Sequence, residues 1–351
     1  MNKSNTLSSR RTELDILRML ATIAVIVIHL CGSTVKSLDV NTSVWALVNC
    51  VHSSASWSVP VFVMISGCLF LNSEKKLTLR DIYGKYIKHI AVCFVVWSAV
   101  FQLYYYFFTN SELNLDGFLC ELIIGPYPFW YLYMIIGVYM IVPFLRTFSV
   151  NKRLLQYFIT LFILFSVITN YATNLPVIGD VVNTVLGKAS FYFVLGFTGY
   201  YILGHYIMQY NFSLKWEIAI YFLGIVGVLI SCIGTTLQSR QQGEYNEWFS
   251  KYLMPNVIFE SMAVFTLFVK RISKIRFSEK TVKLFATLTQ LGFGVYLIHA
   301  LVIEGFNLHG IDILMYSTVV MIPALTVMVY VISLVLTYLI RKVPFIGKRI
   351  T

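Results

Sequence analysis

Charged residues are scarce in this sequence. They make up 12% of the 351 residues, whereas 58% are hydrophobic and the mean hydropathy is +0.75. A water-soluble domain carries about 25% charged residues, so the composition excludes an ordinary soluble fold. No segment between the apolar runs is long or polar enough to build its own water-facing core. We therefore expect residues 1–351 to form one integral-membrane domain.

The sequence also lacks any grouping of metal-binding or disulfide-forming residues. Its six cysteines are scattered, mostly inside apolar runs, with no CxxC pair and no cluster with histidine. This spacing predicts neither a disulfide framework nor a metal site. The net charge of +11 does not require a nucleic-acid partner, because basic residues of membrane proteins collect in cytoplasmic loops.

Apolar runs long enough to cross a bilayer dominate the chain. About 20 apolar residues in a helix span the hydrocarbon core, and ten such runs are present. The prediction is an all-α polytopic bundle of about ten transmembrane helices, at approximately 14–33, 45–71, 86–108, 127–145, 154–171, 189–209, 216–237, 250–269, 284–304 and 313–340. The stretch from 110 to 125 is partly apolar and is expected to form a short surface helix.

The distribution of basic residues predicts the orientation. If both termini are cytoplasmic, 22 of the 27 Lys and Arg residues lie in inner segments, and Arg18 lies within the first span. The outer segments then hold only Lys36, Lys188, Arg240 and Lys251. So uneven a division follows the positive-inside rule.

The first span holds the densest set of ionisable residues: Asp15, Arg18 and His29. Eleven helical steps separate Arg18 from His29, which places them within about 20° on one face and about 16 Å apart along the axis. An arginine near the headgroups paired with Asp15 can be purely structural, and so can a buried histidine. A near-neutral histidine is equally suited to be a general base.

Other polar residues in the spans are weaker candidates. Pro60, after a serine-rich stretch, predicts a broken second span beside a polar cavity. The supporting candidates are Ser66, Trp130, Arg146, His299 and Glu260, with His52 and Glu304 behind them. For each, a structural role as a helix-end anchor or interhelical hydrogen bond is the commoner alternative.

Several ordered strings resemble the acyltransferase 3 family of multispanning membrane O-acyltransferases. An arginine, ten residues and a histidine on the first helix match Arg18 and His29 within LDILRMLATIAVIVIHL. Further family-like strings are VPVFVMISGCLF, FWYLYMIIGVYMIVPFLR and LGFGVYLIHALVI. Within the family, the chain looks most like the enterobacterial common antigen O-acetyltransferase type, although Ser56 and Trp57 stand where many relatives have an arginine.

The resemblance implies an enzyme of the bacterial cytoplasmic membrane. It would move an acyl group, with acetyl expected, from cytoplasmic acyl-CoA to a hydroxyl of a cell-surface or lipid-linked glycan, without a metal.

The side chains of the first span suit this chemistry. His29 can act as the general base, and Arg18 can supply the positive charge that binds the donor or stabilises a developing oxyanion, with Asp15 tuning Arg18. Direct transfer and a transient acyl-His29 both fit. The alternatives are a transporter or flippase and a membrane sensor or scaffold. The oligomeric state stays open.

Overall fold

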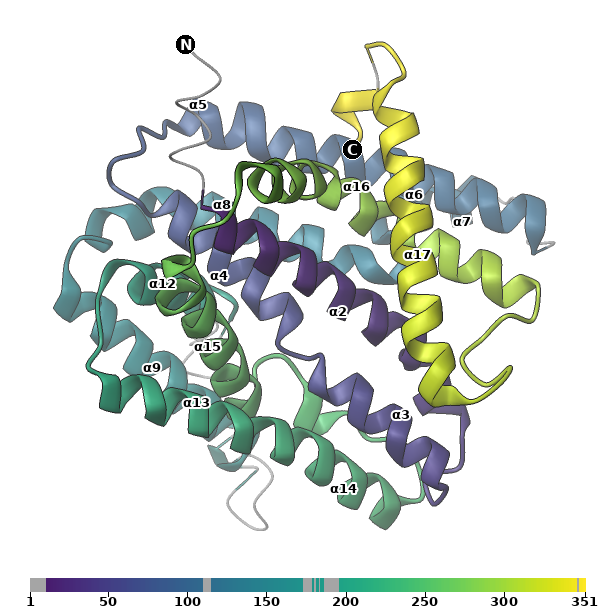
Figure 1. Cartoon of the computed structure of the whole chain (residues 1–351), viewed down its shortest axis with the longest axis horizontal. Helices are drawn as coiled ribbons and strands as arrows, with labels where there is room; N and C mark the ends of the chain where they lie inside the picture. The colour runs from purple at the N-terminus through teal and green to yellow at the C-terminus, as the bar shows by residue number, and fades with distance from the viewer. Residues whose placement is uncertain are drawn as a thin grey trace.

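The computed structural model describes residues 11–109, 115–172, 196–345 and 347–351, together with 179, 181, 182, 184 and 185. Within these residues every regular element is a helix, and no strand occurs. The expected all-α bundle is therefore confirmed. Figure 1 shows the helices packed into a single bundle, with α17 (Thr318–Arg341) running at a steep angle to α6 (Lys88–Phe108).

The elements follow one another along the chain in this order: α2 (Thr12–Ser37), α3 (Ser43–Ser54), α4 (Ser58–Phe70), α5 (Leu79–Asp81), η1 (Ile82–Ile87), α6 (Lys88–Phe108), α7 (Leu115–Ile124), η2 (Tyr127–Phe129), α8 (Trp130–Phe148), α9 (Lys152–Asn170), α12 (Thr198–Gln209), α13 (Leu214–Leu229), η4 (Ile230–Gly234), α14 (Thr235–Gln242), η5 (Trp248–Ser250), α15 (Pro255–Lys270), η6 (Ile272–Lys274), α16 (Glu279–Leu308), α17 (Thr318–Arg341) and η7 (Gly347–Arg349).

Nine stretches of the described residues are helical, long and apolar enough to cross a membrane. They correspond to nine of the ten predicted spans. For the remaining one, at 189–209, residues 189–195 lie outside the described residues, and α12 covers its second half. The short helix expected between 110 and 125 is present as α7.

The second span is broken, as its sequence predicts. α3 ends at Ser54 and α4 starts at Ser58, with a turn between them. Pro60 lies in the first turn of α4, where a residue without an N–H disturbs the helix least. Ser53, Ser56 and Ser58 at the break are buried, and the two residues of this span that line the main cavity, Val59 and Phe62, are apolar.

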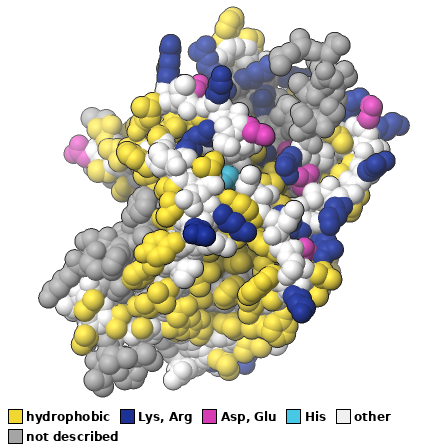
Figure 2. Space-filling view, turned by 90° about the vertical axis from the view of Figure 1, so that its left-hand side faces the viewer, with side chains coloured by type: hydrophobic (Ala, Val, Ile, Leu, Met, Phe, Trp, Pro, Cys, Tyr) yellow, Lys and Arg dark blue, Asp and Glu magenta, His cyan; other side chains and the backbone are white. Residues whose placement is uncertain are grey.

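Helix α2 occupies the middle of the bundle. It contacts α16 most extensively and also packs against α3, α4, α15 and α17, and Figure 1 shows it crossing the centre of the view. Its neighbours bury Leu17, Ala21 and Ile26 completely. On the outside, Figure 2 shows Lys and Arg side chains gathered on one part of the face and a broad apolar surface on another. This division is the one expected of a protein lying across a bilayer.

Two glycines let α4 and α12 approach backbone to backbone. A Cβ at Gly67 would lie 1.9 Å from the carbonyl oxygen of Tyr201, and one at Gly204 would lie 2.2 Å from that of Met64. Small residues at helix crossings are a common packing device in membranes because they maximise van der Waals contact. The two glycines therefore fix the position of α4, which carries part of the cavity wall.

We expect Gly204→Val to lower the stability of the protein, because the added side chain would push α4 and α12 apart. Overpacking of this kind costs about 1–3 kcal/mol. The measurement is the thermal unfolding midpoint of detergent-purified protein. Gly137→Val is the matched control, since Gly137 is also helical and a Cβ there would meet nothing within 4 Å. Equal midpoints for both variants would contradict the close crossing.

Candidate functional site

The continuous helix α2 carries Asp15, Arg18 and His29. Both Arg18 and His29 line one cavity, as their eleven-residue spacing predicts. The opposite wall comes mainly from α16, where Thr289, Phe293 and Tyr296 recur every three or four residues. This spacing places them on one helical face, which packs toward α2.

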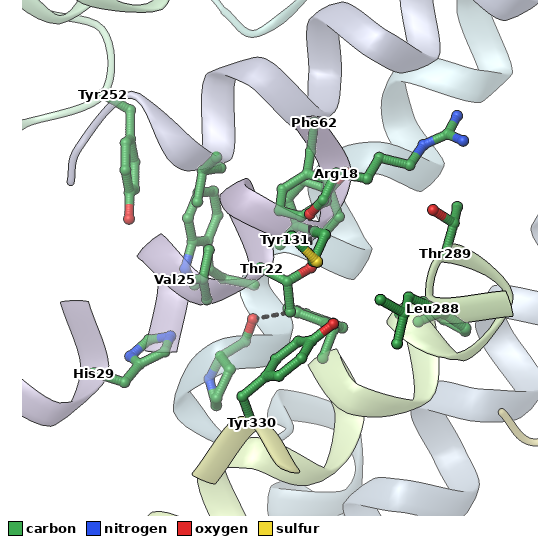
Figure 3. A pocket seen from close by; sticks show the side chains of 17 residues that line it. Arg18, Thr22, Val25, His29, Phe62, Tyr131, Tyr252, Leu288, Thr289 and Tyr330 are labelled. Atoms are coloured by element: carbon green, nitrogen blue, oxygen red, sulfur yellow. Dashed lines mark hydrogen bonds between the residues drawn. The ribbon is translucent and has the colours of Figure 1, made fainter. Parts of the chain in front are cut away.

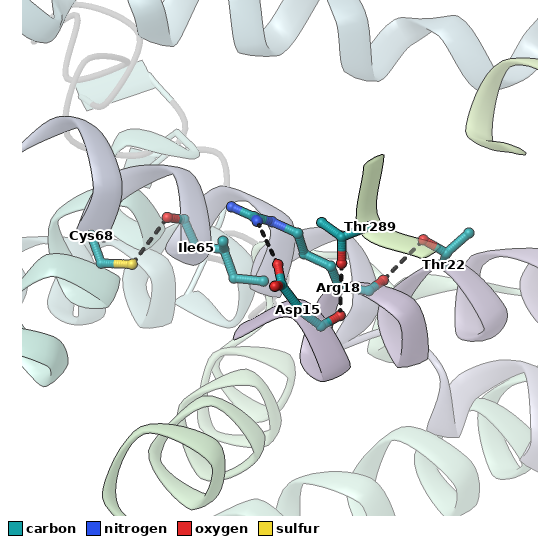
Figure 4. Close-up of polar contacts among 6 residues, drawn as sticks. All are labelled: Asp15, Arg18, Thr22, Ile65, Cys68 and Thr289. Carbon is teal, nitrogen blue, oxygen red and sulfur yellow. Dashed lines mark hydrogen bonds and ion pairs between the residues drawn. The ribbon is translucent and has the colours of Figure 1, made fainter. Parts of the chain in front are cut away.

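Arg18 is held at its base by contacts between α2 and α16 (Figure 4). Its Nη1 lies 3.5 Å from Oδ1 of Asp15, and its side chain remains 28% exposed. The hydroxyl of Thr289 donates to the backbone carbonyl of Asp15 at 3.3 Å, and Thr22 donates to the carbonyl of Arg18 at 2.9 Å. At 3.5 Å the ion pair is loose, so the guanidinium keeps donors available for a ligand.

The cavity has a volume of about 280 Å³ and a largely apolar lining. In Figure 3, Arg18 and His29 lie at opposite ends of the group of lining residues. The seventeen lining residues come from six parts of the chain and are Arg18, Met19, Thr22, Val25, His29, Val59, Phe62, Pro128, Trp130, Tyr131, Tyr252, Leu288, Thr289, Gly292, Phe293, Tyr296 and Tyr330.

Aromatic rings form much of this lining, and they pack against one another. Trp130 stacks on Tyr252 with ring centroids 5.5 Å apart. Tyr131 meets Tyr296 at 5.7 Å, and the Tyr296 hydroxyl donates to the carbonyl of Pro128 at 2.5 Å. The result is a rigid aromatic wall with a few polar groups, which is typical of small-molecule sites.

His29 lies between two further rings. The edge of Tyr127 approaches it with centroids 5.1 Å apart, and the ring of His299 is 5.2 Å away. The structure thus brings together four of the predicted candidates at or beside the cavity: Arg18, His29, Trp130 and His299.

The remaining supporting candidates lie elsewhere in the bundle. Ser66 donates to the carbonyl of Phe62 within its own helix. Arg146 donates to backbone carbonyls of Phe70, Asn72 and Lys75, and so ties the end of α8 to the loop after α4. Glu260 accepts a hydrogen bond from Ser231, 2.5 Å away. None of the three is among the residues that line the cavity.

Most of the aromatic lining of the cavity was not predicted from the sequence. Tyr296 could have been, because it lies one helical turn before His299 and so shares a face of the same helix with it. No sequence signal predicted Tyr252 and Tyr330, because each reaches the cavity from a segment far from α2. Among the described residues, no group of three or more His, Cys, Asp or Glu side chains could hold a metal ion.

The fold and site together define a multi-pass membrane protein with an arginine and a histidine facing a shared apolar cavity inside the bundle. A family model described as "Acyltransferase domain" matches residues 11–340. The chain belongs to this acyltransferase 3 family, and it is a membrane acyltransferase. No curated protein and no solved structure matches the chain.

We expect Arg146→Gln to lower stability with little effect on the site. The substitution removes a donor from the part-buried carbonyls of Phe70, Asn72 and Lys75, and the loss of such hydrogen bonds costs about 1 kcal/mol. The measurement is unfolding of the purified protein by SDS, followed by circular dichroism. Arg153→Gln is the control, because Arg153 is exposed. Loss of acyl transfer in Arg146→Gln at unchanged stability would contradict the structural role.

Proposed function

We propose that the protein is a membrane O-acyltransferase that moves an acyl group from cytoplasmic acyl-CoA to a hydroxyl of a cell-envelope glycan. The observation that carries this proposal is the shared cavity of Arg18 and His29. It provides a fixed cation at one end and an imidazole at the other, about 16 Å apart along α2. A donor bound near Arg18 and an acceptor reaching His29 would meet inside the membrane.

The size and lining of the cavity suit the reacting end of the donor. A volume of about 280 Å³ is at the small end of the range for ligand sites. It accommodates a short acyl group and the adjoining thioester arm, whereas the nucleotide of coenzyme A would stay outside. The apolar walls favour a small acyl chain, and acetyl is the group we propose.

The chemistry assigns a step to each group. His29 removes the proton of the acceptor hydroxyl while the hydroxyl oxygen attacks the thioester carbonyl. The carbon–sulfur bond then breaks, and the departing thiolate takes the proton from the imidazolium. Arg18 binds the anionic part of the donor, and its ion pair with Asp15 orients the guanidinium.

The developing oxyanion needs hydrogen-bond donors in the cavity wall. The side chains of Trp130, Tyr131 and Tyr252 carry an indole N–H or a hydroxyl and all line the cavity. We assign oxyanion stabilisation to this group. Because stacking fixes the Trp130 and Tyr252 rings against each other, such donors would be preorganised.

The acceptor and the location follow from the sequence motifs. The strings SVPVFVMISGCLFL, SFYFVLGF and GVYLIHALVIEG favour an acceptor of the enterobacterial common antigen type. The inner segments carry most of the basic residues, which favours a bacterial cytoplasmic membrane with the donor side inside. The glycan would then approach from outside.

We expect His29→Ala to reduce acyl transfer by about 10²–10⁴-fold, the usual contribution of a general base. Arg18→Ala should mainly raise the KM for acyl-CoA, since it removes a charge contact to the bound donor. The measurement is consumption of radiolabelled acetyl-CoA and labelling of glycan in proteoliposomes. His309→Ala is the control, because His309 is exposed beyond the end of α16.

Full acyl transfer by His29→Ala, at normal protein levels, would overturn the mechanism. Movement of a solute without consumption of the thioester would instead favour the transporter alternative. Mass spectrometry of the envelope glycan from a deletion strain identifies the acceptor, and an unchanged acylation pattern would contradict this acceptor class.

A further inference from the structure

We infer that His299 is the positioning residue of His29, and that the two imidazoles act as a pair. This inference rests on the proposed function of His29 as the base. It gives a role to a buried histidine of α16 that lies outside the cavity lining, behind His29.

The hydrogen bonding of His299 defines its protonation. Its side chain has no exposed surface, and an unpaired charge buried among apolar residues would be costly, so the ring is neutral. Nδ1 lies 2.6 Å from the carbonyl oxygen of Tyr296. A carbonyl can only accept, so Nδ1 carries the proton and Nε2 presents a lone pair.

That lone pair has no partner. Nε2 of His299 is enclosed, and no hydrogen-bond donor meets it within the described residues. A buried polar atom without a hydrogen-bond partner calls for an explanation. Of the several such atoms among the described residues, Nε2 of His299 is the one on a ring that lies against His29. The nearest ring with a donor to offer is that of His29, whose centroid is 5.2 Å away with the planes inclined by 34°. Two imidazoles joined edge to edge by an N–H···N bond of about 2.9 Å have centroids about 5 Å apart, so this separation suits such a bond.

A hydrogen bond from His29 to His299 would select one tautomer of His29. The nitrogen of His29 that faces His299 would carry the proton, and the other nitrogen would present its lone pair to the cavity. A base needs this arrangement before it can accept a proton. When His29 becomes an imidazolium during the reaction, the N–H that faces His299 becomes a stronger donor, so the pair stabilises the charged form.

The remaining neighbours keep both rings in place. The Tyr296 ring lies 5.9 Å from His299, and its hydroxyl is anchored to the carbonyl of Pro128. The Tyr127 edge covers the other side of His29 at 5.1 Å. α2 and α16 are also the most extensively packed partners of this region. The two imidazoles therefore sit on a rigid interface, which positioning requires.

The test compares His299→Leu, which removes the acceptor, with His299→Gln, whose side-chain oxygen reaches the position of Nε2. His205→Leu is the matched control. His205 is also buried, and its Nε2 lies 3.0 Å from the carbonyl of Ser149, but it belongs to α12 and lies outside the cavity lining. Unfolding midpoints of all variants are measured first, so that activities are expressed per folded molecule.

The direct readout is the ¹⁵N spectrum of the histidine-labelled protein, which has only six histidines. His29→Ala identifies the signals of His29. We expect the purified protein to show one fixed tautomer of His29, His299→Leu to show exchange between both, and His299→Gln to restore the single tautomer. An unchanged single tautomer in His299→Leu would overturn the inference.

The kinetic readout follows acyl transfer from acetyl-CoA. We expect His299→Leu to lower kcat by about 10–100-fold, the loss found when a hydrogen-bond partner of a metal-ligating histidine is removed, with KM for acetyl-CoA unchanged. His299→Gln should recover most of kcat, and His205→Leu should retain the wild-type value. A rise in KM alone would overturn the inference. If the wild-type protein transfers no acyl group, the proposed function fails, whereas the spectra still decide whether the histidines pair.

Discussion

The structure depends on one constraint: a helix in lipid must satisfy its backbone hydrogen bonds internally. This requirement keeps α2 continuous over 26 residues, and continuity fixes the geometry of its side chains. Arg18 and His29 can therefore change neither their common face nor their separation of about 16 Å. The other helices supply walls around this fixed pair, and α16 supplies the wall that matters most.

The same constraint means that polar residues of the spans need partners inside the bundle. Arg146 donates to backbone carbonyls, and one carboxylate oxygen of Glu260 accepts from Ser231. Among the described residues, Arg18 forms one ion pair, at 3.5 Å with Asp15, and Nε2 of His299 and Oε2 of Glu260 are buried without a hydrogen-bond partner. Incomplete pairing alone therefore does not mark a residue for chemistry. Arg18 and His29 are distinguished by lining the cavity, and His299 by lying against His29.

The features that depend on local helical geometry could be predicted from the sequence. The apolar runs predicted the nine described spanning helices because length and hydropathy suffice to identify them. The common face of Arg18 and His29 followed from helical pitch alone. The partners of Arg146 and Glu260 could not be predicted, because they lie tens of residues away in the sequence: Lys75 is 71 residues from Arg146. The approach of His299 to His29 depends on the packing of α16 against α2, which no local pattern encodes.

The apolar lining of the cavity bears on the choice between transfer and hydrolysis. Under the proposed function, the thioester meets His29 where a water molecule could compete with the sugar hydroxyl as nucleophile. The imidazole would activate either one, so selectivity depends on what can reach it. A cavity walled by Phe62, Phe293 and stacked aromatic rings offers water few hydrogen-bond partners, and ordered water needs two to four of them. A sugar brings its own binding contacts and can displace what water remains. Exclusion of water by the membrane-embedded aromatic wall would then be as important to the reaction as the base itself.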